Sequence, residues 1–373
     1  MKTLQIQLNR ENYHYDLHVG QGILPTKLVE LLHHRGYGEV FVITNDLIDG
    51  IYPNYFQGIL PEGVHLHQLV LPDGEQYKTI ESINQIYDFL ARSGAHRESL
   101  LIAFGGGVIG DMVGFAAATY MRGASFLQVP TTLLSQVDSS IGGKTGYNHQ
   151  AGKNFIGAFK QPLEVIIDVD FLKTLPEREV VAGYAELIKH AFIADGYLFQ
   201  LLHKTSPVEL KNRADLLIEA VLRSLEVKGR IVESDERESG VRAMLNFGHT
   251  LAHFIEAFTD FQGCLHGEAV ICGMEFAAWY SKERGVLAET DYHLIRNHLK
   301  SLGVSMNLEA VSEDRFVQLV GMDKKVSSQG LRFILLESLG KGQIVKGVQP
   351  GELWRAYQKF QSQGDSLVRQ STL

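Results

Sequence analysis

Short apolar runs alternate with amphipathic stretches through the first half of the chain. The runs are rich in β-branched residues and end in polar or glycine-containing turns, as buried strands do. The strands that this pattern predicts are 40–44, 65–71, 99–104, 126–129 and 165–169. Helical spacing of apolar residues predicts helices at 79–92 and 110–121. Strands separated by helices indicate an α/β fold, with a mostly parallel sheet covered on both faces.

The pattern changes after residue 176. Helical spacing then dominates, and it predicts helices at 179–194, 208–232, 241–258, 267–283 and 291–301. We therefore expect an α/β domain over 1–175 and an all-α domain over 176–373. The segment 361–373 is polar and is expected to fray.

Composition narrows the class of protein. Apolar residues make up 45% of the chain and charged residues 21%, as in soluble globular proteins. The formal net charge of −8 argues against nucleic-acid binding through bulk charge. Two cysteines exclude a disulfide scaffold. Because the first residues lack a signal-peptide core and no stretch reaches the ~20 apolar residues of a membrane span, we expect a cytoplasmic protein with no membrane partner.

A glycine-rich segment, Gly-Gly-Gly-Val-Ile-Gly-Asp at 105–111, lies between a predicted strand and a predicted helix. Glycines there allow a pyrophosphate to approach the backbone at a helix N-terminus. The acid that usually follows about 20 residues later is absent between Asp111 and Asp138, and the glycines follow a mid-sheet strand. Asp46, after an earlier strand, could bind the adenosine ribose instead. A tight turn that packs helix on strand remains the alternative.

A second glycine-rich segment, Asp-Ser-Ser-Ile-Gly-Gly-Lys-Thr at 138–145, ends like a phosphate-binding loop. The ATP-binding pattern requires glycine where this chain has Asp138, so we reject an ATPase. Glycines beside Lys144 still suit an anion, and Lys153 and Asn154 follow in the same loop. A solvated loop is the alternative.

Arg242, Asn246, His249 and His253 are spaced by four, three and four residues. On a helix this spacing places all four side chains on one face. A cation, an amide and two imidazoles on one stripe are hard to explain as core, so we interpret them as a functional surface.

A metal site is a further expectation. Glu186 lies in an apolar helical segment, and His266 follows His249 by seventeen residues. One carboxylate and two imidazoles leave positions open on Zn²⁺, which is the catalytic pattern. Spacing alone does not choose between His253 and His266 as a ligand, and Cys264 is a further candidate.

Taken together, these segments resemble the 3-dehydroquinate synthase family of sugar-phosphate cyclases over nearly the whole chain. The motifs that carry the resemblance are 105–111, 130–134, 136–140, 142–146, 152–154, 185–189, 235–238, 245–250, 266–270 and 323–325. The resemblance implies a Rossmann-like NAD-binding domain followed by a helical metal-binding domain. It also implies a homodimer.

The resemblance implies roles for individual residues. The metal ligands would be Glu186, His249 and His266, holding Zn²⁺ or Co²⁺. The NAD contacts would be Asp46, Glu75, Lys78, Gly106, Gly107, Asp111, Thr131, Thr132, Lys144, Lys153, Phe171 and Thr174. The substrate contacts and catalytic residues would be Asp138, Lys144, Asn154, Lys189, Lys228, Arg242, Asn246, His253 and Lys341, with Arg122 reaching the phosphate site of the neighbouring subunit.

The family's reaction converts 3-deoxy-D-arabino-heptulosonate 7-phosphate to 3-dehydroquinate and phosphate in the shikimate pathway, with NAD⁺ used catalytically. Other sugar-phosphate cyclases act on substrates without a carboxylate, and Arg242 with Asn246 and His253 favours the carboxylate substrate. A metal-dependent polyol dehydrogenase would release NADH and would need no phosphate-binding lysines. A non-catalytic relative is disfavoured because each predicted ligand position keeps a competent residue.

Overall fold

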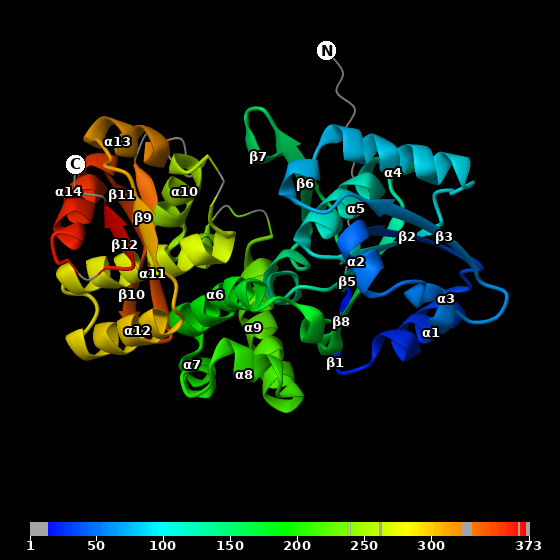
Figure 1. The fold of residues 1–373 in the computed structure, drawn as a ribbon, viewed down its shortest axis with the longest axis horizontal. Helices are drawn as coiled ribbons and strands as arrows, with labels where there is room; N and C mark the ends of the chain where they lie inside the picture. Colours follow the sequence, from blue (N-terminus) through cyan, green and yellow to red (C-terminus); the bar gives the residue numbers. More distant parts are fainter. Residues whose placement is uncertain are drawn as a thin grey trace, which may run out of the picture.

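The computed structural model describes residues 14–236, 238, 240–260, 263–321, 330–364 and 366–370. Two halves lie side by side, an α/β half formed by the first part of the chain and a mostly helical half formed by the rest (Figure 1). The 323–325 motif lies outside the described residues.

A six-stranded parallel sheet forms the centre of the first half. Its order is β1 (Asp16–Gly20), β8 (Glu164–Asp168), β5 (Ser125–Pro130), β4 (Leu100–Gly105), β2 (Glu39–Asn45) and β3 (His65–Leu71). The five predicted strands are confirmed, and β1 is an additional edge strand. Each residue of β4 is buried, as expected where helices cover both faces of a parallel sheet.

Helices cover the two faces of this sheet. The covering helices are α1 (Leu24–Arg35), α2 (Asp46–Ile51), α3 (Tyr55–Ile59), α4 (Ile80–Arg92) and α5 (Gly107–Thr119). Phe41 and Ile43 of β2 pack in one apolar cluster with α4 and α5, whereas Val40 and Val42 pack in another with α1. This alternation is the two-residue period of a strand that is buried on both faces.

The strand order explains the mid-sheet position of the glycine motif. From β2 the chain steps outward to β3, then crosses back over β2 to β4 and continues to β5. Strands β2 and β4 are therefore neighbours whose following connections diverge. Ligands bind in the crevice at the carboxyl ends of such a pair. Asp46 follows β2 and Gly106 follows β4 at this point.

Gly142 and Gly143 lie before the first strand, at φ values of +92° and +64°, but the loop expected to hold Lys144, Lys153 and Asn154 is an antiparallel hairpin, so that part of the interpretation was wrong. Its strands are β6 (Lys144–His149) and β7 (Gly152–Phe159), which stand out beside α4 in Figure 1. Gly146 and Gly157 face each other across the pair, and a Cβ on Gly146 would lie 2.4 Å from the carbonyl oxygen of Ile156. Gly146 and Gly157 thus allow the two strands to pair closely.

The second half is mostly helical, as predicted. Its helices are α6 (Glu177–Ala194), α7 (Gly196–Leu202), α8 (Pro207–Lys211), α9 (Ala214–Ser234), α10 (His249–Phe258), α11 (His266–Glu283), α12 (Glu289–Ser301), α13 (Glu313–Gly321) and α14 (Pro350–Gln361). Helix α11 is buried along nearly its whole length. The predicted helix 208–232 is interrupted at residues 212–213, between α8 and α9.

Two small sheets were not predicted in this half. Strands β10 (Leu331–Ser338) and β11 (Lys341–Val348) pair antiparallel, and β9 (Met306–Leu308) pairs with β12 (Val368–Gln370) in parallel. The expectation that 361–373 frays is therefore wrong for Val368–Gln370, because that segment is held by backbone pairing.

The two halves share one continuous apolar core. Leu133, Val137 and Val165 from the first half pack in the same cluster as Leu187 of α6 and Phe276 of α11. This packing fixes α6 against the carboxyl side of the sheet. Across the described ranges, no helix has the length and apolar content that a membrane crossing would require.

Candidate active site

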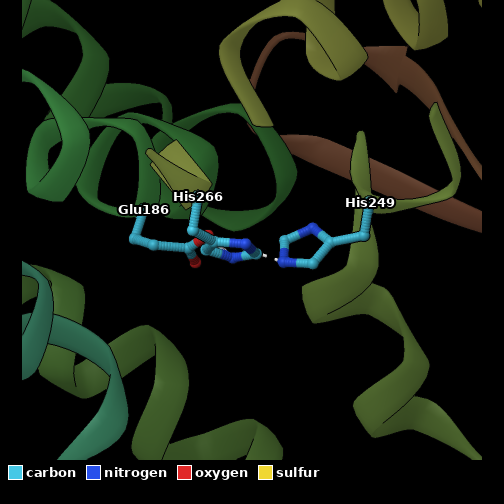
Figure 2. A group of neighbouring side chains, drawn as sticks. All are labelled: Glu186, His249 and His266. Carbon is cyan, nitrogen blue, oxygen red and sulfur yellow. Dashed lines mark ion pairs between the residues drawn. The ribbon is translucent and has the colours of Figure 1, made fainter. Parts of the chain in front are cut away.

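Glu186, His249 and His266 form a compact donor cluster. They come from α6 and from the first residues of α10 and α11, and Figure 2 shows their polar ends converging. The Oε1 atom of Glu186 lies 3.6 Å from Nε2 of His249 and 3.8 Å from Nε2 of His266. This oxygen is buried and has no hydrogen-bond partner in the described part of the chain. An orphaned carboxylate oxygen facing two imidazole nitrogens fits a divalent metal ion such as Zn²⁺.

Glycines allow the three helices to approach closely enough. A Cβ on Gly267 would lie 1.9 Å from the carbonyl oxygen of Ala182, where α11 crosses α6. A Cβ on Gly273 would lie 2.0 Å from the carbonyl oxygen of Gly248, where α11 passes the start of α10. The ligand positions therefore depend on backbone-to-backbone contacts that no larger residue permits.

Each imidazole is oriented through its other nitrogen. Nδ1 of His249 lies 3.1 Å from the carbonyl oxygen of Phe247, and Nδ1 of His266 lies 3.2 Å from Oε1 of Glu256. An acceptor at Nδ1 holds the proton there and leaves the Nε2 lone pair facing Glu186. Burial raises the pKa of Glu256, but the contacts with His266 and Lys153 outweigh burial and lower the pKa to about 2.

Glu256 did not emerge from the sequence as a candidate. The signal that could have found it is its position three residues after His253, on the same helical stripe, as the only carboxylate within α10. His253 itself lies beside the cluster, with its ring centre 5.5 Å from that of His249 and 6.5 Å from that of His266. It is not part of the donor group, and neither is the half-buried Cys264.

The prediction that 241–258 is one helix was wrong. A 3₁₀ segment, Val241–Asn246, ends before Gly248, whose φ of +80° breaks the chain away from a right-handed helix, and α10 begins only at His249. A side chain on Gly248 would also meet the backbone nitrogen of Met274 at 2.7 Å. Arg242 and Asn246 therefore do not share a helical face with the two histidines.

Two lysine–carboxylate pairs, each with a buried lysine, lie beside the donor cluster. Lys189 pairs with Glu186 one turn earlier in α6, and Nζ of Lys228 in α9 lies 2.6 Å from Oδ1 of Asp138. Asp138 belongs to a π-helical turn, Ser135–Ser139, a conformation that is frequent at functional sites. Burial raises the pKa of Asp138, but Lys228 and Lys189 outweigh burial and hold this carboxyl ionised.

Arg242 is a buried cation in this region. Its side chain packs against Gly142, where a Cβ would lie 2.4 Å from Nη2, and burial lowers its pKa. Nη1 donates a hydrogen bond to the carbonyl oxygen of Glu236. Among the described residues, no carboxylate forms an ion pair with this guanidinium. A buried arginine in this state is suited to receive a carboxylate from a ligand.

A carboxylate lies between two of the predicted substrate contacts. Glu238 pairs with Lys144, and Nδ2 of Asn246 donates to Oε1 of Glu238 over 2.9 Å. Glu238 was part of the 235–238 motif but was not singled out as a site residue. Its position shows that Lys144 and Asn246 together accommodate anionic oxygens.

The carboxyl edge of the sheet offers a site for a pyrophosphate. Gly106 is the N-cap residue of α5, and it has no side chain to cap the first amide groups of the helix. A Cβ on Gly106 would lie 3.2 Å from Cγ2 of Thr132, and one on Gly107 would lie 2.9 Å from Oγ of Ser139. The backbone amides at the start of α5, in this narrow space beside Thr132 and Ser139, fit the pyrophosphate of a dinucleotide.

Five other predicted NAD contacts lie just after the carboxyl ends of strands of this sheet. Asp46 begins α2 after β2, and Thr131 and Thr132 follow β5. Phe171 and Thr174 lie in the 3₁₀ segment Val169–Thr174 after β8, against Tyr52. All five thus lie on the side of the sheet where the crevice opens.

A polar network joins the hairpin to the turn after β3. Nζ of the buried Lys78 lies 2.6 Å from Oδ2 of Asp111 and 2.5 Å from Oδ1 of Asn154. Nδ2 of Asn148 donates to Oε1 of Glu75 over 2.7 Å. Asn154, expected at the substrate, is therefore bonded to the predicted cofactor residue Lys78. Burial raises the pKa of Asp111, although Lys78 opposes this rise.

Two predicted residues have exposed side chains. Arg122 is exposed at the far end of α5 from Gly107, about 20 Å away at 1.5 Å per residue. Lys341, at the start of β11, is exposed and pairs with Glu337 over 2.5 Å.

Comparison with known proteins places the chain in a family. Residues 68–182 match the family described as "3-dehydroquinate synthase N-terminal", and residues 183–326 match "3-dehydroquinate synthase C-terminal". A 3-dehydroquinate synthase of Nitrosospira multiformis is 44% identical over 331 residues, which are 88% of this chain and 90% of that protein.

Two solved structures share the fold. One is 2-epi-5-epi-valiolone synthase from Streptomyces hygroscopicus with NAD⁺ and Zn²⁺ bound; its TM-score is 0.86 at 25% identity, covering 97% of this chain and 100% of that one. The other is 2-deoxy-scyllo-inosose synthase complexed with carbaglucose-6-phosphate, NAD⁺ and Co²⁺. Its TM-score is 0.83 at 23% identity, and the match covers 93% of this chain and 97% of that one. From the matches across both halves and the identity over most of its length, the chain belongs to the 3-dehydroquinate synthase family.

Proposed function

We propose that this chain converts 3-deoxy-D-arabino-heptulosonate 7-phosphate to 3-dehydroquinate and phosphate, the reaction of its family. The observation that carries the choice of substrate is the buried Arg242, which forms no ion pair with a carboxylate among the described residues and lies near the anion contacts Lys144 and Asn246. A substrate with both a carboxylate and a phosphate satisfies both features.

We further propose that residues 1–175 bind NAD⁺ and that 176–373 provide the metal and most substrate contacts. Glu186, His249 and His266 would hold Zn²⁺ or Co²⁺, since their donor set leaves positions open for substrate oxygens. The bound metal would polarise a substrate hydroxyl, and bound NAD⁺ would exchange a hydride with the substrate reversibly.

The chain's own cations would position the substrate. Arg242 forms a bidentate pair with the substrate carboxylate, and Lys228 adds positive charge beside it. Lys144 and Asn246 bind the phosphate after Glu238 leaves them. Because Lys189 neutralises Glu186, the donor cluster carries little net negative charge to repel this dianion.

A proton must leave the carbon next to the oxidised position when phosphate is eliminated. The leaving phosphate takes it, and His253, beside the two histidines of the donor cluster, assists. Asp138 and Asn154 complete the substrate pocket. We propose that the exposed Lys341 turns toward the phosphate and that Arg122 serves the phosphate site of a second copy in a homodimer.

The NAD⁺ site would use the crevice between β2 and β4. Gly106 and Gly107 receive the pyrophosphate at the start of α5, and Asp46 binds a ribose. The remaining contacts would be Glu75, Lys78, Asp111, Thr131, Thr132, Lys144, Lys153, Phe171 and Thr174.

The test is phosphate release with absorbance at 340 nm followed in parallel. The enzyme, with NAD⁺ and Zn²⁺, receives the heptulosonate phosphate, sedoheptulose 7-phosphate or glucose 6-phosphate. We expect phosphate from the heptulosonate alone and no net NADH. Phosphate from a neutral sugar would overturn the substrate, and NADH without phosphate would indicate a dehydrogenase.

A matched pair of variants sharpens this test. Arg242→Ala should lower kcat/KM for the heptulosonate phosphate about 100-fold, because a buried hydrogen-bonded charge pair is lost, while its metal content stays normal. Arg230→Ala, at an exposed position of α9, serves as the control. Loss of zinc in Arg242→Ala would show that Arg242 supports the metal site and does not bind the carboxylate.

A further inference from the structure

One buried carboxylate close to the site has no role in the reaction outlined above. Glu256 lies in α10 and is 6% exposed. Its Oε1 atom lies 3.2 Å from Nδ1 of His266 and 3.7 Å from Nζ of Lys153. The first contact reaches a predicted metal ligand of the helical half, and the second reaches β7 of the sheet half. The same oxygen atom therefore touches one functional residue from each half of the molecule.

The contact with His266 determines which nitrogen is available to a metal. A carboxylate at Nδ1 accepts the ring proton there, so Nε2 keeps its lone pair and faces Oε1 of Glu186 at 3.8 Å. His249 is oriented in the same way by the carbonyl oxygen of Phe247. The two ligands differ in one respect, because a backbone carbonyl is fixed by the fold whereas Glu256 is a side chain that can respond to its second neighbour.

That second neighbour is Lys153, a predicted NAD contact. The hairpin that carries it is also tied to the predicted cofactor residues Glu75 and Lys78, through Asn148 and Asn154. Lys153 already lies against Glu256, and a ligand that orders this hairpin would hold it there. The carboxylate in turn is held in the position that orients His266.

We propose that Glu256 is a positioning residue that couples the metal site to the dinucleotide site, so that each ligand tightens the binding of the other. The inference rests on the proposed function for the identity of the two ligands. Coupling of this kind is reciprocal, and its usual size is about 5- to 150-fold in affinity. A purely structural role for Glu256 would instead lower stability and leave the ratio of affinities unchanged.

The experiment measures two affinities in the absence of substrate. Zn²⁺ affinity is determined by competition with a chelator, with and without saturating NAD⁺, and NAD⁺ affinity is determined by calorimetry, with and without Zn²⁺. For the unmodified chain we expect each ligand to raise the affinity of the other at least fivefold. Equal affinities under both conditions would overturn the proposal.

Three variants separate the two contacts. Glu256→Leu removes the acceptor, so Zn²⁺ affinity should fall about 10- to 100-fold and the coupling should vanish. Glu256→Gln keeps an oxygen for His266 but loses the charge that attracts Lys153, so Zn²⁺ affinity alone should stay within a few-fold while the coupling weakens. Lys153→Met should leave Zn²⁺ affinity without NAD⁺ unchanged and remove the coupling.

Glu226→Gln, an exposed glutamate of α9, is the matched control and should behave as the unmodified chain. Glu256→Asp serves if Glu256→Leu does not fold, and it should show intermediate Zn²⁺ affinity. Unchanged Zn²⁺ affinity in Glu256→Leu, or unchanged coupling in Lys153→Met, would overturn the proposal. Failure of the proposed function would appear separately, as an unmodified enzyme that releases no phosphate from the heptulosonate.

Discussion

The carboxyl edge of the sheet and the three-helix donor cluster are assembled in different ways. At the sheet edge, the segments following β2, β4 and β5 reach the same crevice because parallel strands end together. In the cluster, Glu186, His249 and His266 come from three separate helices that meet through glycine contacts. The first site is a consequence of topology, whereas the second depends on the distance between helix backbones. Substitutions should therefore affect the two regions differently.

The largest expected effect concerns the metal ligands themselves. His266→Ala should lower Zn²⁺ affinity more than about 100-fold. Mutation of a residue that only orients a metal ligand already lowers metal affinity about 10- to 100-fold, and loss of the ligand itself should lower it further. His253→Ala should keep its zinc, since that ring lies outside the donor group. The zinc content of each variant is measured after dialysis, and circular dichroism serves as the control for folding. Full zinc content in His266→Ala would move the ligand role to His253 or Cys264.

The next effect tests whether helix spacing determines the cluster. Gly267→Ala places a methyl group against the carbonyl of Ala182, so it should lower the free energy of unfolding by about 1–3 kcal/mol and weaken Zn²⁺ binding. Gly229→Ala in α9 has open space around it and should raise the free energy of unfolding by about 0.5–1 kcal/mol. Urea titrations compare them. Equal stabilities for the two variants would refute the role of the close approach.

A smaller effect is expected at the sheet edge. Gly107→Ala should weaken NAD⁺ binding about tenfold, or ~1.4 kcal/mol, because its methyl group enters the cradle beside Ser139. Zn²⁺ affinity measured without NAD⁺ should not change, since Gly107 is not part of the donor group. Gly58→Ala is the control, because the added methyl group meets no described atom within 4 Å beyond its own turn of helix. A lower Zn²⁺ affinity in the absence of NAD⁺ would show that this substitution disturbs the donor cluster directly.

The smallest effect is a pH dependence in the helical half. Burial lowers the pKa of His298 to about 4, and Nε2 of His298 lies 2.9 Å from the hydroxyl of Tyr184. The unfolded chain binds this proton near pH 6.5 and the folded chain only near pH 4, so stability falls as the pH drops through that range. Between pH 6.5 and 5.5 this group should lower the free energy of unfolding by about 1 kcal/mol.

His298→Gln should remove that part of the pH slope and leave the contributions of other groups in place. Urea titrations of both proteins at several pH values give the difference. Parallel stability curves for the two proteins would contradict the assignment to His298.

The comparison also explains what the sequence could and could not predict. The strands are confirmed nearly to the residue, because β-branched runs between turns are a local signal, and the glycine motif lies where it was expected. The β6–β7 hairpin was interpreted as a loop because its strands contain lysine, glycine and asparagine, which are depleted in strands. The turn at Gly248 depends on its contact with α11, and nothing in the 241–258 spacing signalled it.

The donor cluster shows the same limit. Spacing could not choose between His253 and His266, because both follow His249 at distances that a fold can bring together. The resemblance proposed His266, and the structure places that residue in the cluster. Glu238 and Glu256 were missed because a carboxylate in sequence gives no sign of the lysine, amide or imidazole that it will contact.

The most direct test of the account is a crystal of the protein grown with Zn²⁺ and measured at the zinc absorption edge. The account predicts one anomalous peak bonded to Oε1 of Glu186 and to Nε2 of His249 and His266, at about 2.0–2.2 Å from each. A peak bonded instead by Asp138, Glu186 and His190, the second group of donors that lie close together among the described residues, would contradict it.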